Sequence, residues 1–278
     1  MVIGQSDTET PLAIVAGGGD IPFALADALA AKGRPFVIFP IRGAADPSRV
    51  GAYRHHWIEL GQAGRFIRLA RAERCRELVF IGGLKRPSLW RLRFDLATLV
   101  RLPRIIAAFW GGDDHLLRSI GRILERDGFI LRGAQEFAPQ VVMPEGVLTT
   151  RCPSPSDYAN IALGLRSLHD NGPRDIGQAV VVANGAILAL EDAAGTDALL
   201  KRVRGMPGAG VLVKAPKPSQ DRRYDLPAIG PTTVAGVAEA GLSGIAVAAG
   251  GGIVADAERM VETANRANIF IVGIRDVP

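Results

Sequence analysis

The stretch LAIVAGGGDIP, residues 12–22, is the part of the sequence that decides the fold. Five apolar residues lead into three glycines, and Asp20 and Pro22 follow, a pattern typical of the start of a helix. An apolar run that passes through a glycine turn into a helix is typical of a buried parallel strand in an α/β domain. We therefore expect a strand over 12–16, and a helix that ends before Gly33.

The rest of the first half continues this alternation of strands and helices. Further strands are predicted over 35–39, 78–81 and 129–131, and helices over 65–74 and 113–126. Because such an alternation builds a parallel sheet flanked by helices, we predict an α/β fold, with a Rossmann-like N-terminal domain over residues 1–137.

The composition then changes, and the second half reads differently. Prolines and a glycine punctuate 138–155, which we interpret as a linker. Asn184 and Gly185 between two apolar stretches are a strong hairpin signal. We predict a C-terminal catalytic domain of mixed α/β type over 156–278, with hairpin strands at 179–183 and 186–190, further strands at 211–213, 244–248 and 269–272, and helices at 156–169, 196–204, 234–240 and 255–267.

Composition and charge exclude several classes of protein. With 48% hydrophobic and 22% charged residues, the 278-residue chain is neither disordered nor, in the absence of an internal period, a repeat solenoid. Its formal net charge of +5 suits anionic ligands or an anionic membrane surface better than nucleic acid. Two distant cysteines, Cys75 and Cys152, support neither a disulfide framework nor a zinc site. With no recognisable signal peptide or spanning segment, we expect a cytoplasmic protein.

The glycine turn after the first predicted strand is a candidate anion site. Backbone amides at Gly17, Gly18, Gly19 and Asp20 can cradle phosphate groups at a helix N-terminus, although glycine-rich turns after strands also often serve only tight packing. A dinucleotide fingerprint is incomplete, because Pro22 stands where its last glycine belongs. A nucleotide-sugar oxidoreductase is therefore only an alternative.

The segment KAPKPSQDRRYDLPAIGPTT, residues 214–233, is the strongest candidate for chemistry. Asp221 and Asp225 are four residues apart and can reach one hard cation such as Mg²⁺, which commonly takes one or two carboxylates plus substrate phosphate oxygens. Cationic side chains in the segment can neutralise a diphosphate: Lys214, Lys217, Arg222 and Arg223. The pattern indicates metal-assisted phosphoryl or nucleotidyl chemistry; the alternative is a solvated surface loop.

A second polar cluster, EDAAGTD at 191–197, follows the predicted hairpin. Its acidic residues and Thr196 either cap the next helix or contact a metal or a sugar hydroxyl. Gln178, just before the hairpin, is similarly polar.

Together these motifs resemble the LpxI-type UDP-2,3-diacylglucosamine pyrophosphatases of lipid A biosynthesis. The resemblance rests on pieces that span nearly the whole chain in order: IVAGGGDIP at 14–22, IGGLKRP at 81–87, GGDDHLLRSI at 111–120, DIGQAVVVANG at 175–185, EDAAGTDALL at 191–200 and VLVKAPKPSQDRRYDLPAIGPTT at 211–233.

The resemblance implies Mg²⁺-dependent hydrolysis of UDP-2,3-diacylglucosamine to UMP and 2,3-diacylglucosamine 1-phosphate (lipid X). It implies that water attacks the phosphorus next to the sugar, and that two domains close around the substrate. The family's critical aspartate matches Asp225, whereas Asp221 as a second metal ligand is inferred from spacing. Lys214 joins them as a catalytic candidate, and no residue stands out as a general base.

The remaining predictions concern binding. The expected substrate contacts are Gly17, Gly18, Gly19, Asp20, Lys85, Arg86, Gln178, Thr196, Asp197, Lys217, Gln220, Arg222 and Thr232. Four histidines are too few for a dinuclear metallophosphoesterase, and His55-His56 suits a surface pair better than a metal site.

The segment 87–110 interleaves arginines with Leu, Phe and Trp and can form amphipathic helices. It is predicted either to cover acyl chains or touch the inner membrane, or to pack between the domains. The resemblance also suggests a homodimer. A non-catalytic nucleotide-sugar or lipid-binding protein is the further alternative.

Overall fold

The chain forms two compact units in a computed structural model. The structure describes residues 10–83, 113–171, 177–192, 194–206, 208–217, 221, 223 and 226–275, and for 113–118 the backbone alone. Among these residues, the first unit consists of those up to Pro139 together with Arg223, and the second unit consists of all the others from Gln140 onward.

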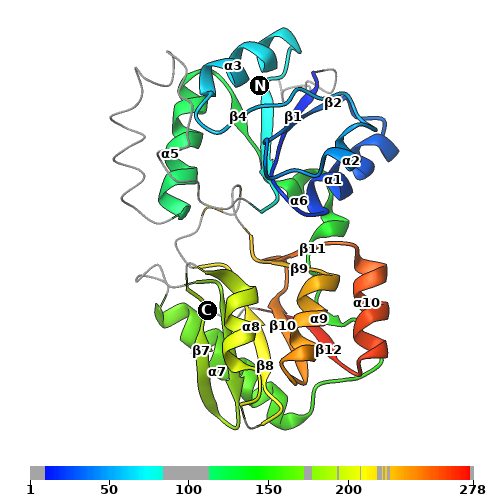
Figure 1. The fold of residues 1–278 in the computed structure, drawn as a ribbon, viewed down its shortest axis with the longest axis vertical. Coiled ribbons are helices and arrows are strands. Elements are labelled where there is room, and N and C mark those ends of the chain that lie inside the picture. The colour runs from blue at the N-terminus through cyan, green and yellow to red at the C-terminus, as the bar shows by residue number, and fades with distance from the viewer. Residues whose placement is uncertain are drawn as a thin grey trace, which may run out of the picture. The chain divides into compact units, whose positions relative to one another are not determined.

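The first unit is a parallel sheet with helices on both faces (Figure 1). Its strands lie in the order β2-β1-β3-β4, and all three neighbouring pairs are parallel. The described elements are β1 (Leu12–Ala16), α1 (Ile21–Ala31), β2 (Phe36–Pro40), α2 (Pro47–Val50), α3 (Ala63–Ala72), β3 (Glu77–Ile81), α5 (Asp113–Arg126), β4 (Ile130–Leu131) and α6 (Ala134–Phe137).

The core of this unit follows from the alternation of side chains along β1. Ala13 and Val15 point to one face, where they join Phe66 of α3 and Leu124 of α5 in a buried cluster. Helix α1 contacts β1, β2 and α6, and α6 contacts β3. Each face of the parallel sheet is thus covered, as the predicted strand and helix alternation requires.

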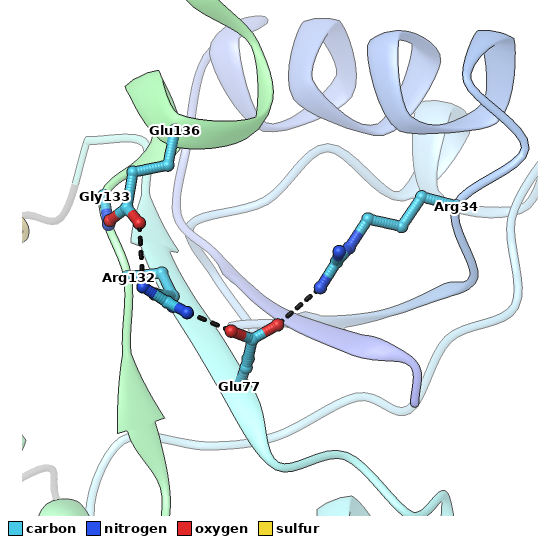
Figure 2. A network of polar contacts seen from close by, with 5 residues as sticks. All are labelled: Arg34, Glu77, Arg132, Gly133 and Glu136. Carbon is cyan, nitrogen blue, oxygen red and sulfur yellow. Dashed lines mark hydrogen bonds and ion pairs between the residues drawn. The ribbon is translucent and has the colours of Figure 1, made fainter. Parts of the chain in front are cut away.

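A charged network fixes the chain around β4 and α6 (Figure 2). Glu77, the first residue of β3, accepts a hydrogen bond from Arg132 Nε at 2.7 Å and pairs with Arg34 on its other oxygen. The backbone amide of Gly133 donates to Glu136 Oε1 at 2.7 Å, so the first turn of α6 is capped by its own glutamate. The network therefore ties the α1–β2 connection and the α6 region to the start of β3.

The second unit is built on a six-stranded mixed sheet in the order β5-β12-β10-β8-β6-β7. Strands β12, β10 and β8 pair in parallel, whereas β5, β6 and β7 are each antiparallel to a neighbour. The described elements are a short 3₁₀ helix at the division (Pro139–Val141), β5 (Gly146–Val147), α7 (Pro155–Asn171), β6 (Ala179–Ala183), β7 (Ala186–Leu190), α8 (Gly195–Val203), β8 (Val211–Lys214), β9 (Ala228–Ile229), α9 (Pro231–Glu239), β10 (Gly244–Ala248), β11 (Ile253–Val254), α10 (Ala257–Arg266) and β12 (Phe270–Ile274).

Two cores lie on the two faces of this sheet. Helices α8, α9 and α10 supply Leu199, Val234 and Met260 to one core, and α7 contributes Ile161 to the other. Gly164 lets α7 approach closely, because a Cβ there would lie 2.7 Å from a methyl of Val213. The α/β fold predicted for both halves is confirmed.

Three details differ from the prediction. The division after Pro139 falls inside the predicted linker 138–155, whose later part contributes β5 to the second sheet. The two-residue strands β9 and β11 form a separate parallel pair that the sequence did not indicate. Asp20 precedes α1 but makes no side-chain cap, and its carboxylate instead contacts Arg49 Nη1 at 3.2 Å. Proline in the first turn therefore marks the start of α1.

Across the described ranges, no helix combines the length and hydropathy that crossing a bilayer requires.

Candidate functional site

The predicted site residues that the structure describes gather mainly at two sheet edges, one in each unit. In the first unit, β1 and β3 are neighbours in the sheet; the chain leaves β1 for β2 on one side and leaves β3 for β4 on the other, so these two connections run in opposite directions. Open α/β sheets bind ligands outside the carboxyl ends of their strands at such a switch point. The turn at Gly17–Asp20 follows β1 at this edge, and Gly82-Gly83 follows β3 there.

Two amides of the glycine turn are already used within the protein. Gly17 N donates to Ile81 O at 2.8 Å, and Gly18 N donates to Gly83 O at 2.7 Å. A Cβ on Gly17 would lie 2.6 Å from the Gly83 carbonyl oxygen, so this glycine is required where the two turns cross. Gly19, exposed and with φ of +87°, has open space around it. The part of the turn that remains available to an anion is thus the part around Gly19.

Arginines that the sequence analysis did not select lie close to this edge. Arg49 contacts Asp20 and covers the ring of Phe23 at 4.8 Å, and Arg42 lies over Trp57 at 5.4 Å. Both arginine side chains remain about half exposed. Their positions shortly after the second strand are the signal that could have identified them. Lys85 and Arg86, predicted as phosphate contacts, lie outside the described residues.

The second unit brings further predicted residues to one edge of its sheet. Lys214 at the end of β8 pairs in register with Ala179 on one side and Val247 on the other. Gln178 immediately precedes β6, and Glu191 immediately follows β7. Because β6 runs antiparallel to both β7 and β8, its start meets their ends.

Side-chain and backbone groups at this edge form one hydrogen-bonded network around the buried ammonium group of Lys214. Lys214, which is 5% exposed, donates from Nζ to Thr196 Oγ1 at 2.9 Å and to the Ala228 carbonyl oxygen at 3.1 Å. The Thr196 hydroxyl donates to Glu191 Oε1 at 2.6 Å, and the backbone amide of Gln178 donates to Glu191 Oε2 at 2.7 Å. Burying a cation costs free energy unless hydrogen-bond acceptors surround it. This network provides two acceptors for Lys214 and a carboxylate, that of Glu191, one hydrogen bond away.

The cluster at 191–197 therefore divides between two roles. Thr196 and Glu191 belong to the Lys214 network, whereas Asp192 organises the turn before α8. Its carboxylate accepts from Ala194 N at 2.9 Å, and this bond, followed by the charge of Arg202, lowers the pKa of Asp192. Asp197 is exposed in the first turn of α8, as Thr232 is in the first turn of α9.

The structure describes only part of the polar segment after β8. Lys217 and Asp221 are half-buried, and Arg223 contacts Glu125 Oε1 at 3.0 Å within the first unit. Gln220, Arg222 and Asp225 lie outside the described residues, so the proposed pairing of Asp221 with Asp225 stays a prediction.

A protein-only metal cage is not found in the part of the chain that the structure describes, where no three His, Cys, Asp or Glu side chains could hold an ion together. Hard oxygen ligands from two aspartates still suit Mg²⁺, because this ion usually keeps waters and takes phosphate oxygens from a substrate. His56, predicted as part of a bland surface pair, instead contacts Glu73 Oε1 through Nε2 at 2.6 Å.

Each of the two units matches a model of a known protein family. Residues 11–141 match the family model of the LpxI N-terminal domain, and residues 144–272 match that of the LpxI C-terminal domain. The chain belongs to the LpxI family. The two matched ranges meet close to the division that the structure shows after Pro139.

A curated relative agrees with this assignment. The protein from Caulobacter vibrioides named UDP-2,3-diacylglucosamine pyrophosphatase LpxI is 39% identical over 272 residues, which cover 95% of this chain and 97% of that relative. The family predicted from the sequence motifs is therefore confirmed.

Proposed function

We propose that the protein hydrolyses the pyrophosphate bond of UDP-2,3-diacylglucosamine to UMP and 2,3-diacylglucosamine 1-phosphate in lipid A biosynthesis. The observation that carries the proposal is the match of both units to the LpxI family, together with a relative named for this activity that aligns over nearly its full length. The network of Thr196 and Lys214 supports it, because the side chains of two predicted site residues meet at one sheet edge.

Pyrophosphate cleavage needs positive charge, since negative charge builds on the departing UMP phosphate. We assign this role to cations of the polar segment, Lys217 and Arg222, and to Lys85 and Arg86 after β3. The Gly19–Asp20 end of the first glycine turn is proposed to contact the UDP moiety, because its space is open and Gly17 and Gly18 are engaged elsewhere.

Mg²⁺ is the proposed cofactor, with Asp225 and Asp221 as its protein ligands. When bound, it supplies Lewis-acid polarisation of the diphosphate. The protein itself would hold the carboxylates of Asp221 and Asp225 close enough to bind one ion, and would place cationic side chains beside the substrate phosphates.

The acyl chains require an apolar surface, for which we propose residues 87–110, which lie outside the described residues. The same segment is proposed to contact the inner-membrane surface. We also propose that the protein forms a homodimer. Sedimentation equilibrium would measure its oligomeric state.

The experiment is incubation with UDP-2,3-diacylglucosamine, with and without Mg²⁺ and EDTA, followed by measurement of UMP. We expect UMP release that EDTA abolishes. Asp225→Asn should lower the rate by about 100-fold or more while substrate still binds, because it removes a charged group needed in the transition state rather than in the ground state. Asp170→Asn, at an exposed position of α7, is the matched control and should retain the rate.

Two outcomes would contradict the proposal. Tight binding of the substrate by the wild-type protein without turnover would indicate a binding protein. A change in nicotinamide absorbance with a nucleotide sugar would indicate an oxidoreductase.

A further inference from the structure

We propose that Lys214 is a positioning residue that closes the base of the 215–227 segment, and that Thr196 and Glu191 hold its ammonium group in place. The consequence for catalysis rests on the proposed function, because the 215–227 segment carries the predicted metal ligands and several predicted phosphate contacts.

The side chain of Lys214 bridges the two ends of this segment. Lys214 is the last residue of β8, immediately before the segment, and Ala228 is the first residue of β9, immediately after it. The hydrogen bond of 3.1 Å from Lys214 Nζ to Ala228 O therefore joins two residues that the whole segment separates. A side chain at the end of one strand thus holds the start of another.

The glycine turn after β10 packs against the same two ends. A Cβ on Gly251 would lie 2.9 Å from Pro216 Cδ, and one on Gly252 would lie 3.2 Å from the Pro227 carbonyl oxygen. That carbonyl also accepts from Ile253 N at 2.8 Å, at the point where β9 pairs with β11. The first and the last proline of the segment are therefore both held at its base.

Thr196 determines where the ammonium group points. Its hydroxyl donates to Glu191, so its lone pairs face Lys214 Nζ, from which it accepts at 2.9 Å. The backbone amide of Gln178 holds Glu191 in place. The backbone carbonyl of Gln178 accepts a hydrogen bond of 3.1 Å from the backbone amide of Ala215, the first residue of the segment. The network therefore joins β6, β7, α8 and β8 to the base of the segment.

This arrangement has a functional consequence. A segment with fixed ends has fewer conformations, so less entropy is lost when its side chains close on a substrate. Removing the hydroxyl of Thr196 takes away an acceptor of the buried ammonium group and breaks its link to Glu191. The base of the segment should then open without any change in the segment's own residues.

The test compares Thr196→Val with Thr196→Ser and with Thr263→Val, a matched control whose hydroxyl bonds only within α10. Limited trypsin digestion, read by mass spectrometry, reports cleavage after Arg222 and Arg223, because Pro218 protects the bond after Lys217. UMP release reports kcat and KM.

We expect Thr196→Val to raise the initial cleavage rate in the segment and to lower kcat by about tenfold or more, the scale that a small misplacement of positioned groups produces. Thr196→Ser, which keeps the hydroxyl, should restore both values, and Thr263→Val should match the wild type in both.

The outcomes separate this proposal from the proposed function. If Thr196→Val were cleaved at the wild-type rate, the role of Lys214 would be overturned even if kcat fell, because its contacts at the base of the segment would then not govern cleavage within the segment. Absence of UMP release from the wild-type protein would overturn the proposed function, while the trypsin result would still decide the structural role. Should Thr196→Val fail to fold, Thr196→Ala replaces it under the same two criteria.

Discussion

Gly17 is a residue at which the need for glycine is steric. An added Cβ would lie 2.6 Å from the Gly83 carbonyl oxygen and 2.8 Å from that of Gly82, and backbone atoms in two crossing turns cannot move aside cheaply. Gly17→Ala should therefore lower the free energy of unfolding by about 1–3 kcal/mol, the usual cost of overpacking. Urea denaturation of the full chain measures it.

The control for this prediction is Gly51→Ala, since a Cβ on Gly51 meets nothing within 4 Å and its φ of −59° suits alanine. That variant should unfold within about 0.5 kcal/mol of the wild type, or be slightly more stable. Equal effects of the two substitutions would contradict the steric explanation.

For single residues, the sequence indicated which polar residues belong to the candidate site, but it could not show which groups they contact. Thr196 and Lys214 were chosen as polar residues and their side chains do share a network, which Gln178 joins through its backbone amide. Glu191 as the acceptor of both the Gln178 backbone amide and the Thr196 hydroxyl depends on the register of β6 against β7 and β8, which the local sequence does not contain. Likewise, the use of the Gly17 and Gly18 amides is decided by the distant turn after β3.

Between elements, Glu73 joins the end of α3 to the chain that follows β2. Its carboxylate pairs with His56 Nε2 and with Arg54 Nη2, each at 2.6 Å, and its side chain is only 10% exposed. The hydrogen bond from His56 is the largest cause that lowers the pKa of Glu73 from 4.5, with Arg54 contributing further and burial acting in the opposite direction.

This lowered pKa predicts a pH dependence of stability. A carboxyl group whose pKa is lower in the folded state stabilises that state above its unfolded pKa, and this contribution is lost as pH falls through the folded value. The difference in unfolding free energy between the wild type and Glu73→Gln should be full above about pH 5 and should shrink as the pH falls below that value. Chemical denaturation at a series of pH values measures it.

Glu258→Gln, at an exposed position in the first turn of α10, is the control, and it should show a smaller difference throughout. A difference for Glu73→Gln that grows as the solution becomes more acidic would mean that the contact does not favour the ionised carboxylate.

Elements that carry a clear hydrophobic period were predictable. The predicted hairpin strands at 179–183 and 186–190 match β6 and β7, and the predicted helix at 113–126 matches α5. Strands β5, β9 and β11 have two residues each, too few for any period to show, whereas the equally short β4 lies in the apolar run at 129–131 that was predicted as a strand. The pairing of β5, β9 and β11 is imposed by the larger sheet and by the turn after β10, so only the folded chain reveals it.

For the whole molecule, the shift in composition predicted two domains, and the structure divides the chain within the same stretch. The position of Arg223 was not predictable. It follows β8 of the second unit in the sequence, yet it packs with the first unit beside Glu125. Sequence order alone gives no sign of such a crossing, because it depends on a contact between residues far apart in the chain.

The net charge of +5 and the proposed diacyl substrate together predict association with anionic bilayers. Flotation with vesicles that contain anionic lipid should recover the protein, and neutral vesicles or high salt should release it, since screening shortens the range of the attraction. Trp90→Ala/Arg91→Glu should weaken binding by about tenfold, because it removes an interfacial aromatic ring and reverses a charge. Tyr158→Ala/Arg166→Glu on α7 makes the same kinds of change, with both positions exposed. If this control lost as much binding, total charge rather than residues 87–110 would govern the association.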